Sequence, residues 1–216
     1  FQIKEDPKTH NMHITSDGEF YYTCNGGKPD KGRINKFDFD GNLIDTYIIK
    51  LDMRSIMYNG KDKHFYVCSY DGNIYKITDI KYGSFEVVHK EIYSNAQANL
   101  ALSPNGKLLY YFNEGVLLVY NFKNGKLKKT ITGLDCGKDV KTGSSCVAVD
   151  DKYIYTWNSD YSLIFIYDLK GNKIKSEKIS KGNYGFSLSY ANGLIFVSID
   201  GDYGTGYWYG YDLWKK

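Results

Sequence analysis

The chain has 216 residues, and its composition excludes several classes of protein. Lysine and arginine number 28 against 25 aspartates and glutamates, which gives a formal net charge of +3 with both signs scattered along the chain. This weak, mixed charge argues against nucleic acid as a partner. No apolar run approaches the roughly 18 residues that a membrane span needs. A chain of this length can bury roughly 70% of its unfolded surface, so one closed domain over residues 1–216 is expected.

Five copies of one pattern follow one another along the chain. Each contains a short apolar strand, an Asp-Gly or Asn-Gly type of turn, an aromatic strand, a polar connector and an apolar strand that ends in a second turn. The aromatic strands end at residues 24, 68, 112, 157 and 198, in steps of 44, 44, 45 and 41 residues. A period of about 40–45 residues with four strands per unit is typical of β-propeller blades. The sequence therefore predicts an all-β, five-bladed β-propeller with four antiparallel strands per blade.

The blades are expected at residues 10–50, 53–93, 97–132, 144–180 and 184–216, the last completed by residues 1–5. The predicted strands of the first three blades are 12–15, 19–24, 33–39 and 43–49; 55–57, 64–68, 73–78 and 85–92; 100–103, 108–112, 116–122 and 127–131. Those of the last two are 146–149, 153–157, 163–169 and 174–179; 186–189, 194–198 and 207–213. The Asn-Gly and Asp-Gly turns that separate these strands supply the positive φ angles that tight hairpins require.

Several predicted strands are apolar on both faces, for example residues 116–120 and 163–167. Such strands need cover on both sides, which helices usually provide. No helical period is visible in this sequence. Blades that stack face to face solve the same problem, because each blade covers its neighbours.

The fifth blade lacks an outer strand, while the chain begins with an alternating fragment at residues 1–4. We expect this fragment to pair beside residues 211–213 and to close the ring. Closure hides two strand edges that would otherwise template aggregation.

Four segments resemble known propeller repeats. Gly32-Arg33-Ile34-Asn35-Lys36-Phe37-Asp38-Phe39-Asp40-Gly41-Asn42-Leu43 is similar to the second half of an NHL-type repeat. Leu102-Ser103-Pro104-Asn105-Gly106-Lys107-Leu108-Leu109-Tyr110 resembles the related YVTN-type repeat, and Tyr167-Asp168-Leu169 and Tyr211-Asp212-Leu213 resemble a strand ending of both. The resemblance covers nearly the whole chain but only its scaffold residues. It implies blade geometry, in a superfamily that includes scaffolds for protein partners, RNA binders and a few lyases. Five-bladed propellers include small lectins and some glycosidases.

Propellers bind ligands at one mouth of the central channel, formed by the loops before the inner strands and those between the second and third strands. Three such loops are long: 25–31, 133–145 and 200–206. Polar residues at the ends of the inner strands converge there, and one tyrosine joins them from a loop: His10, Asn11, Arg54, Gln97, Asn99, Ser144, Asn183, Tyr184 and Tyr203. These groups suit a small polar ligand, such as a glycan, or a peptide or protein. The alternative is that they cap strand ends and hold channel waters.

Catalytic and metal-binding signals are weaker. His10 and His13 could suggest a metal pair, but their spacing on a strand predicts opposite faces, so no metal site, catalytic residue or cofactor is predicted. Carboxylates on the mouth loops are Asp30, Glu114, Asp160, Asp200 and Asp202. Because glycosidases need two carboxylates across a pocket, a hydrolase or lyase stays an alternative. No Gly-x-Ser-x-Gly elbow, phosphate loop or Cys-x-x-Cys is present.

The favoured function is a non-enzymatic binding domain that acts as a monomer and uses its mouth for a glycan, a peptide or a protein. A scaffold module of a larger assembly is the other alternative, and the natural chain can be longer than these residues. Cys136 and Cys146 flank one loop and could form a disulfide, which would suit an extracytoplasmic compartment, periplasmic or secreted. The cysteines can equally be small buried apolar residues.

Overall fold

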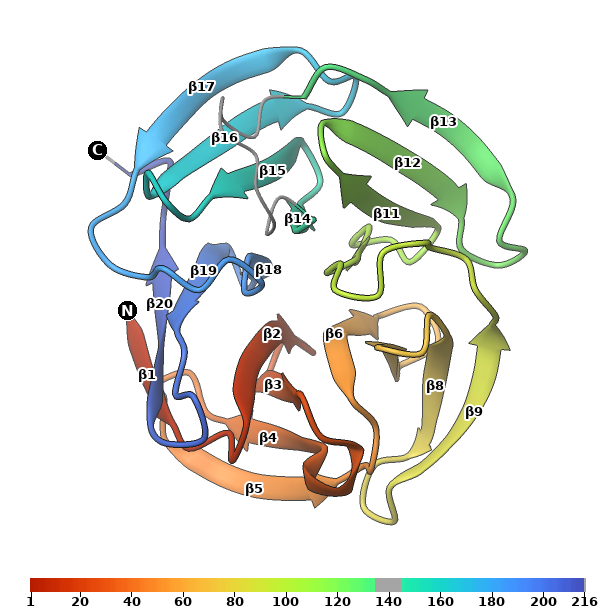
Figure 1. The fold of residues 1–216 in the computed structure, drawn as a ribbon, viewed down its shortest axis with the longest axis vertical. Coiled ribbons are helices and arrows are strands. Elements are labelled where there is room, and N and C mark those ends of the chain that lie inside the picture. The colour runs from red at the N-terminus through yellow and green to blue at the C-terminus, as the bar shows by residue number, and fades with distance from the viewer. Residues whose placement is uncertain (135–144, 216) are drawn as a thin grey trace.

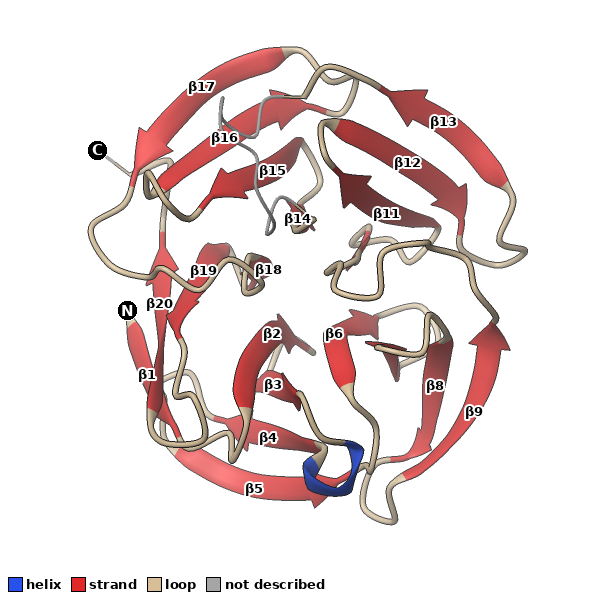
Figure 2. Ribbon diagram, in the orientation of Figure 1, coloured by secondary structure: helices blue, strands red, loops and turns tan. Residues whose placement is uncertain are grey.

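The computed structural model of the chain describes residues 1–134 and 145–215. Five four-stranded antiparallel sheets stand radially around a central axis (Figures 1 and 2). The predicted five-bladed β-propeller is confirmed. Within these residues, no helix is long and apolar enough to cross a membrane.

Each blade takes four strands in sequence order, except the last. The strands of blades 1 to 3 are β2 (His10–Ser16), β3 (Tyr21–Gly26), β4 (Arg33–Phe37) and β5 (Leu43–Ile48); β6 (Met53–Asn59), β7 (His64–Ser69), β8 (Ile74–Asp79) and β9 (Ser84–His89); β10 (Ala101–Leu102), β11 (Leu108–Asn113), β12 (Val116–Asn121) and β13 (Leu127–Ile131). Those of blades 4 and 5 are β14 (Val147–Val149), β15 (Tyr153–Asn158), β16 (Leu163–Asp168) and β17 (Lys173–Lys178); β18 (Ser189–Ala191), β19 (Leu194–Ile199), β20 (Gly206–Tyr211) and β1 (Gln2–Glu5). One 3-10 turn, η1 (Pro29–Lys31), precedes β4.

The first strand of each blade lies nearest the axis (Figure 1). These inner strands contact one another in a closed cycle, β2 to β6, β6 to β10, β10 to β14, β14 to β18 and β18 back to β2. The core lies between blades, in five clusters of buried apolar residues that each draw on two neighbouring blades. Each blade is therefore the cover of the next, as the doubly apolar strands predicted.

Strand β1 closes the ring as predicted, but in a different register. Gln2 pairs with Tyr209 and Glu5 with Gly206, and the Gly210 N–H donates to the Phe1 carbonyl at 3.0 Å. The expected partners, residues 211–213, lie beyond this pairing. The reason is burial: Ile3 is fully buried and stands opposite Trp208, which is also fully buried. A shift toward residues 211–213 would take Ile3 away from this contact.

The inner strands differ most from their predicted bounds. Strand β18 begins at Ser189 rather than at 186, because Ser187 uses its side chain to accept the Ser198 N–H at 2.8 Å and to donate to the Tyr184 carbonyl at 2.7 Å. Strand β10 ends before Ser103, whose hydroxyl accepts the Leu108 N–H at 3.0 Å and so starts the turn early. Side-chain bonds of this kind compete with the strand ladder.

One side-chain pair repeats in three blades and marks the same turn. A tyrosine on the second strand donates its hydroxyl to an aspartate of the preceding turn. The pairs are Tyr22 with Asp17 at 2.8 Å, Tyr66 with Asp62 at 2.6 Å and Tyr155 with Asp150 at 2.6 Å. In blades 1 and 3 the glycine of this turn adopts a positive φ angle, 95° at Gly18 and 67° at Gly106, which glycine tolerates best.

Candidate functional site

Strand polarity sorts the connecting loops onto the two faces of the ring. In every blade the inner strand starts at one face and the second strand returns to it. The loops that lead into the inner strands therefore share this face with those between the second and third strands. We call it the mouth. The long predicted mouth loop 133–145 lies almost wholly outside the described residues.

A histidine–aspartate pair lies at the mouth where blade 5 meets blade 1. His10 opens β2 and Asp200 directly follows β19. His10 Nδ1 lies 2.6 Å from Asp200 Oδ2, and the Asn11 N–H donates to Oδ1 at 2.9 Å. In the neutral tautomer that donates Nδ1–H to the carboxylate, Nε2 is an acceptor. Gly27 packs on the same ring, since a Cβ there would lie 2.9 Å from His10 Cδ2.

Two tyrosines flank the His10 ring. Tyr184 is stacked on it, with ring centroids 6.1 Å apart, and Tyr203 meets it edge-on at 5.2 Å. The ammonium groups of Lys28 and Lys31 lie 5.4 and 5.9 Å from the Tyr203 centroid, within the range of cation–π contacts. Tyr203 is 48% exposed, so its ring forms the side of this group that faces solvent. We call His10, Tyr184, Asp200 and Tyr203 the mouth cluster.

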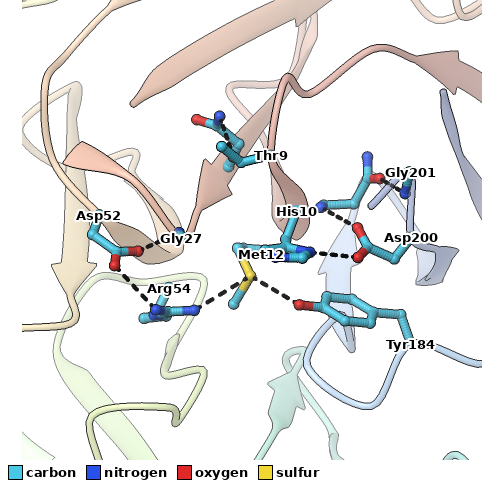
Figure 3. A network of polar contacts seen from close by, with 11 residues as sticks. Thr9, His10, Met12, Gly27, Asp52, Arg54, Tyr184, Asp200 and Gly201 are labelled. Carbon is cyan, nitrogen blue, oxygen red and sulfur yellow. Dashed lines mark hydrogen bonds and ion pairs between the residues drawn. The ribbon is translucent and has the colours of Figure 1, made fainter. Parts of the chain in front are cut away.

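A second charged pair adjoins the cluster from blade 2 (Figure 3). The Asp52 carboxylate accepts the Gly27 N–H at 2.6 Å and Arg54 Nη2 at 3.1 Å. Met12 Sδ lies 3.8 Å from Arg54 Nη1 and 3.7 Å from the Tyr184 hydroxyl, so the thioether joins the two groups. Burial raises the pKa of Tyr184, and the charge of Asp200 adds to this rise, so the phenol stays protonated.

Arg54 is largely buried and keeps one free donor. Its Nε has no hydrogen-bond partner among the described residues, while its guanidinium carbon lies 4.7 Å from the Tyr70 centroid. An unpaired buried donor has a desolvation cost. Arg54 lies at the mouth beside Asp52, and its part in ligand binding stays a prediction.

A cation could be held by three residues of the mouth. Ligand atoms of His10, Asp200 and Asp202 all lie within 4.8 Å of one another. However, Asp200 already binds His10 and the Asn11 backbone. His13, the other histidine considered from the sequence, lies elsewhere: its Nδ1 bonds to the Ile56 carbonyl at 2.9 Å, and burial lowers its pKa to about 4.

Two of the predicted ligand residues are built into the protein interior instead. Asn11 is fully buried; its amide donates to Glu5 Oε2 at 2.8 Å and accepts the Gly201 N–H at 3.0 Å. Asn99 is also fully buried, and its Nδ2 donates to the Met12 carbonyl at 3.0 Å and to the Phe186 carbonyl. Asn99 therefore ties blade 3 to blades 1 and 5. Neither side chain belongs to the site.

The remaining predictions lie apart or cannot be placed. Gln97 is half-buried and Asn183 is exposed, and neither belongs to the mouth cluster. Ser144 and Cys136 lie outside the described residues. Cys146 is a free thiol that donates to the Gly185 carbonyl at 3.0 Å, and burial raises its pKa to about 12.

The sequence prediction missed Lys28, Lys31 and Asp52. Asp200 and Asp202 were predicted as mouth carboxylates. The contact of Asp200 with His10 could not be predicted, because the two residues are 190 positions apart and no local pattern indicates it. Asp52 stands two residues before Arg54, but it precedes β6 and the pairing of β6 with β7 shifts between Met53 and Ser55, so strand alternation does not predict their contact.

Comparison with known proteins supports the fold. The chain is similar to a crystal structure of glutaminyl cyclase from Myxococcus xanthus, with 10% sequence identity, a TM-score of 0.66, and coverage of 98% of this chain and 96% of that one. At this identity the likeness shows the fold alone. A structure of apo AztD from Citrobacter koseri has 13% identity and a TM-score of 0.44, too low to carry an argument; the match covers 81% of this chain but only 49% of AztD. No protein-family model and no curated protein matches the chain. The NHL and YVTN resemblance stays a prediction.

Proposed function

We propose that this β-propeller is a binding domain whose mouth cluster holds a neutral polar ligand, foremost a glycan. The observation that carries the proposal is the three-ring group of His10, Tyr184 and Tyr203, assembled from two blades and held by Asp200. Aromatic faces stack on the apolar faces of sugar rings, while the neighbouring charged groups bond to hydroxyls.

The electrostatics of the mouth favour a neutral ligand. Asp52, Asp200 and Asp202 stand against Arg54, Lys28 and Lys31, so neither sign dominates. A ligand with many hydroxyls can use both donors and acceptors without a net charge of its own.

The test is calorimetric titration of the protein with a panel of neutral oligosaccharides. We expect saturable binding by at least one of them and a roughly fivefold or greater loss of affinity in Tyr203→Ala, since stacking on one aromatic ring contributes about 1 kcal/mol or more. Tyr82→Ala is the matched control, because Tyr82 is 85% exposed and lies in the β8–β9 turn, on the face opposite the mouth. Binding by no sugar, or equal affinities of the two variants, would contradict the proposal and favour a scaffold role.

One observation favours a second candidate, acid–base catalysis on the bound ligand. The Asp200 carboxylate orients His10 through Nδ1, the arrangement that leaves Nε2 available as a general base. The test is to incubate each ligand with the protein and to look for products by NMR. Turnover that disappears in Asp200→Asn, with binding retained, would support catalysis; an unchanged ligand would leave binding as the function.

A further inference from the structure

A second, separate groove lies between blades 2 and 3, on the face opposite the mouth. It has a volume of about 710 Å³, within the range of ligand sites. Its walls are the turn after β6, the end of β9, the turn after β10 and the β12–β13 hairpin. Apolar atoms of Val88, Leu108 and Phe122 contribute to its lining.

Four lysines line this groove: Lys61, Lys107, Lys123 and Lys128. All four are exposed, and none forms an ion pair with a described residue. Two are held by rigid turns, since the Lys61 N–H donates to Asn59 Oδ1 at 3.1 Å and the Lys107 N–H to Asn105 Oδ1 at 3.0 Å. The turns thus bring these positive charges together around the groove.

The acidic residue of the groove does not neutralise these lysines. Asp62 accepts the Tyr66 hydroxyl at 2.6 Å and the His64 N–H at 3.2 Å. This pair is the blade 2 copy of the repeated Tyr–Asp turn bond, also present as Tyr22 with Asp17 and Tyr155 with Asp150. The same bond is present in turns that have no lysine-lined groove beside them. We therefore attribute the Asp62 side chain to the stability of its turn.

The equivalent groove between blades 4 and 5 shows that blade geometry does not require lysines. That groove has a volume of about 440 Å³, and its lining includes Asp150, Asp151 and a single lysine, Lys152. There Tyr153 and Trp214 stack at 4.4 Å. The positive rim is therefore a property of the blade 2–blade 3 groove.

We propose that this groove binds a short acidic peptide segment. An apolar side chain of the peptide would lie on Val88, Leu108 and Phe122, and its carboxylates would face the lysines. The lysines come from three separate segments, so they suit several spaced negative charges rather than one compact anion. This site is independent of the mouth cluster and of its proposed ligand.

The test is fluorescence anisotropy with a labelled peptide that carries two acidic residues on each side of a phenylalanine. We expect saturable binding that weakens as salt rises, because screening shortens the reach of exposed charges. The triple variant Lys61→Gln, Lys107→Gln and Lys123→Gln should lose roughly tenfold or more in affinity. The control Lys81→Gln, Lys170→Gln and Lys178→Gln removes the same charge from exposed lysines outside the groove and should bind like the wild type.

Four outcomes would overturn the inference. The first three are no binding by the wild type, an equal loss in both triple variants, and equal binding of a peptide with lysines in place of the acidic residues. Displacement of the peptide by inorganic phosphate in a small excess would also overturn it, since that result indicates a phosphate site. Tyr203→Ala should leave peptide binding unchanged, which separates this test from that of the mouth.

Discussion

Glu5 is a buried carboxylate in the strand that closes the ring. Its side chain accepts four hydrogen bonds, from Thr23 and Asn35 on Oε1 and from Asn11 at 2.8 Å and Trp208 at 2.6 Å on Oε2. None of these partners carries a positive charge. Burial raises the pKa of Glu5 above its ordinary value of 4.5, and the four hydrogen bonds oppose the rise. A carboxylate is the one side chain that satisfies four donors at this position.

We predict that Glu5→Gln destabilises the fold by about 1–3 kcal/mol, because its amide turns two N–H groups toward buried donors, whereas a protonated Glu5 carboxyl has one O–H, which the Thr23 hydroxyl can accept. The effect should depend on pH. Since the folded-state pKa is raised, the stability that Glu5 contributes is fully present below pH 4.5 and is lost as pH rises through the folded-state pKa. Urea unfolding from pH 4 upward, at about 0.5-unit steps, should show the gap to wild type narrowing as pH rises.

The control for this series is Glu19→Gln, which removes an exposed carboxylate. It should leave the free energy of unfolding within about 0.5 kcal/mol of wild type. A gap that widens with pH in Glu5→Gln would mean that the hydrogen bonds outweigh burial and that the folded-state pKa of Glu5 is lowered instead.

Asn99 gives a second prediction. Its amide binds the carbonyls of Met12 and Phe186, so Asn99→Ala should leave both without this partner and cost about 1–3 kcal/mol in the free energy of unfolding. The affinity of the mouth for its ligand should not change, as measured by calorimetry. Asn183→Ala, at an exposed position, is the control for stability. Weaker ligand binding in Asn99→Ala, with unfolding unaffected, would restore Asn99 to the site.

At the scale of elements, β1 is the strand on which ring closure depends. Ile3→Ala should cost about 2–5 kcal/mol, the usual range for a fully buried isoleucine. In thermal unfolding this corresponds to roughly 2–4 °C per kcal/mol for a domain of this size. The neighbouring exposed position provides the control Gln2→Ala, and deletion of residues 1–5 should destabilise more than either. Equal melting temperatures for the deletion and the wild type would mean that β1 does not close the ring.

The existence and order of the strands could be predicted from the sequence, because alternation and turn residues are local signals. The register of β1 could not, since it depends on the packing of Ile3 against Trp208, which lies at the other end of the chain. The predicted start of β18 at residue 186 is wrong for a related reason. The Ser187 hydroxyl, rather than a backbone carbonyl, accepts the Ser198 N–H, and the apolar pattern of residues 186–189 does not indicate this.

At the scale of the whole molecule, the core clusters between blades predict cooperative unfolding. Trp208 is buried in the cluster between blades 5 and 1, where the ring closes. In the variant Trp157→Phe with Trp214→Phe, Trp208 is the only tryptophan. Its fluorescence and the far-UV circular dichroism should then report the same urea midpoint. Trp208 fluorescence that changes at lower urea would show that blade 5 detaches first.

The site was less predictable than the fold. The period of the sequence located the mouth and placed His10, Arg54, Tyr184 and Tyr203 on it. It could not distinguish these from Asn11 and Asn99, which occupy equivalent strand ends but turn to Glu5 and to the Met12 carbonyl. Which polar side chains face a ligand and which face the protein is decided by contacts between blades, and these are remote in sequence.

NMR titration of isotope-labelled protein with the neutral oligosaccharide panel is the most informative single measurement. A ligand seated on the mouth cluster should shift the backbone amides of Gly27, Asp200 and Tyr203 and leave those of Gly106 and Lys107, on the opposite face, unchanged. Shifts confined to the opposite face, or none with any sugar, would contradict the proposal that this propeller binds a glycan at its mouth.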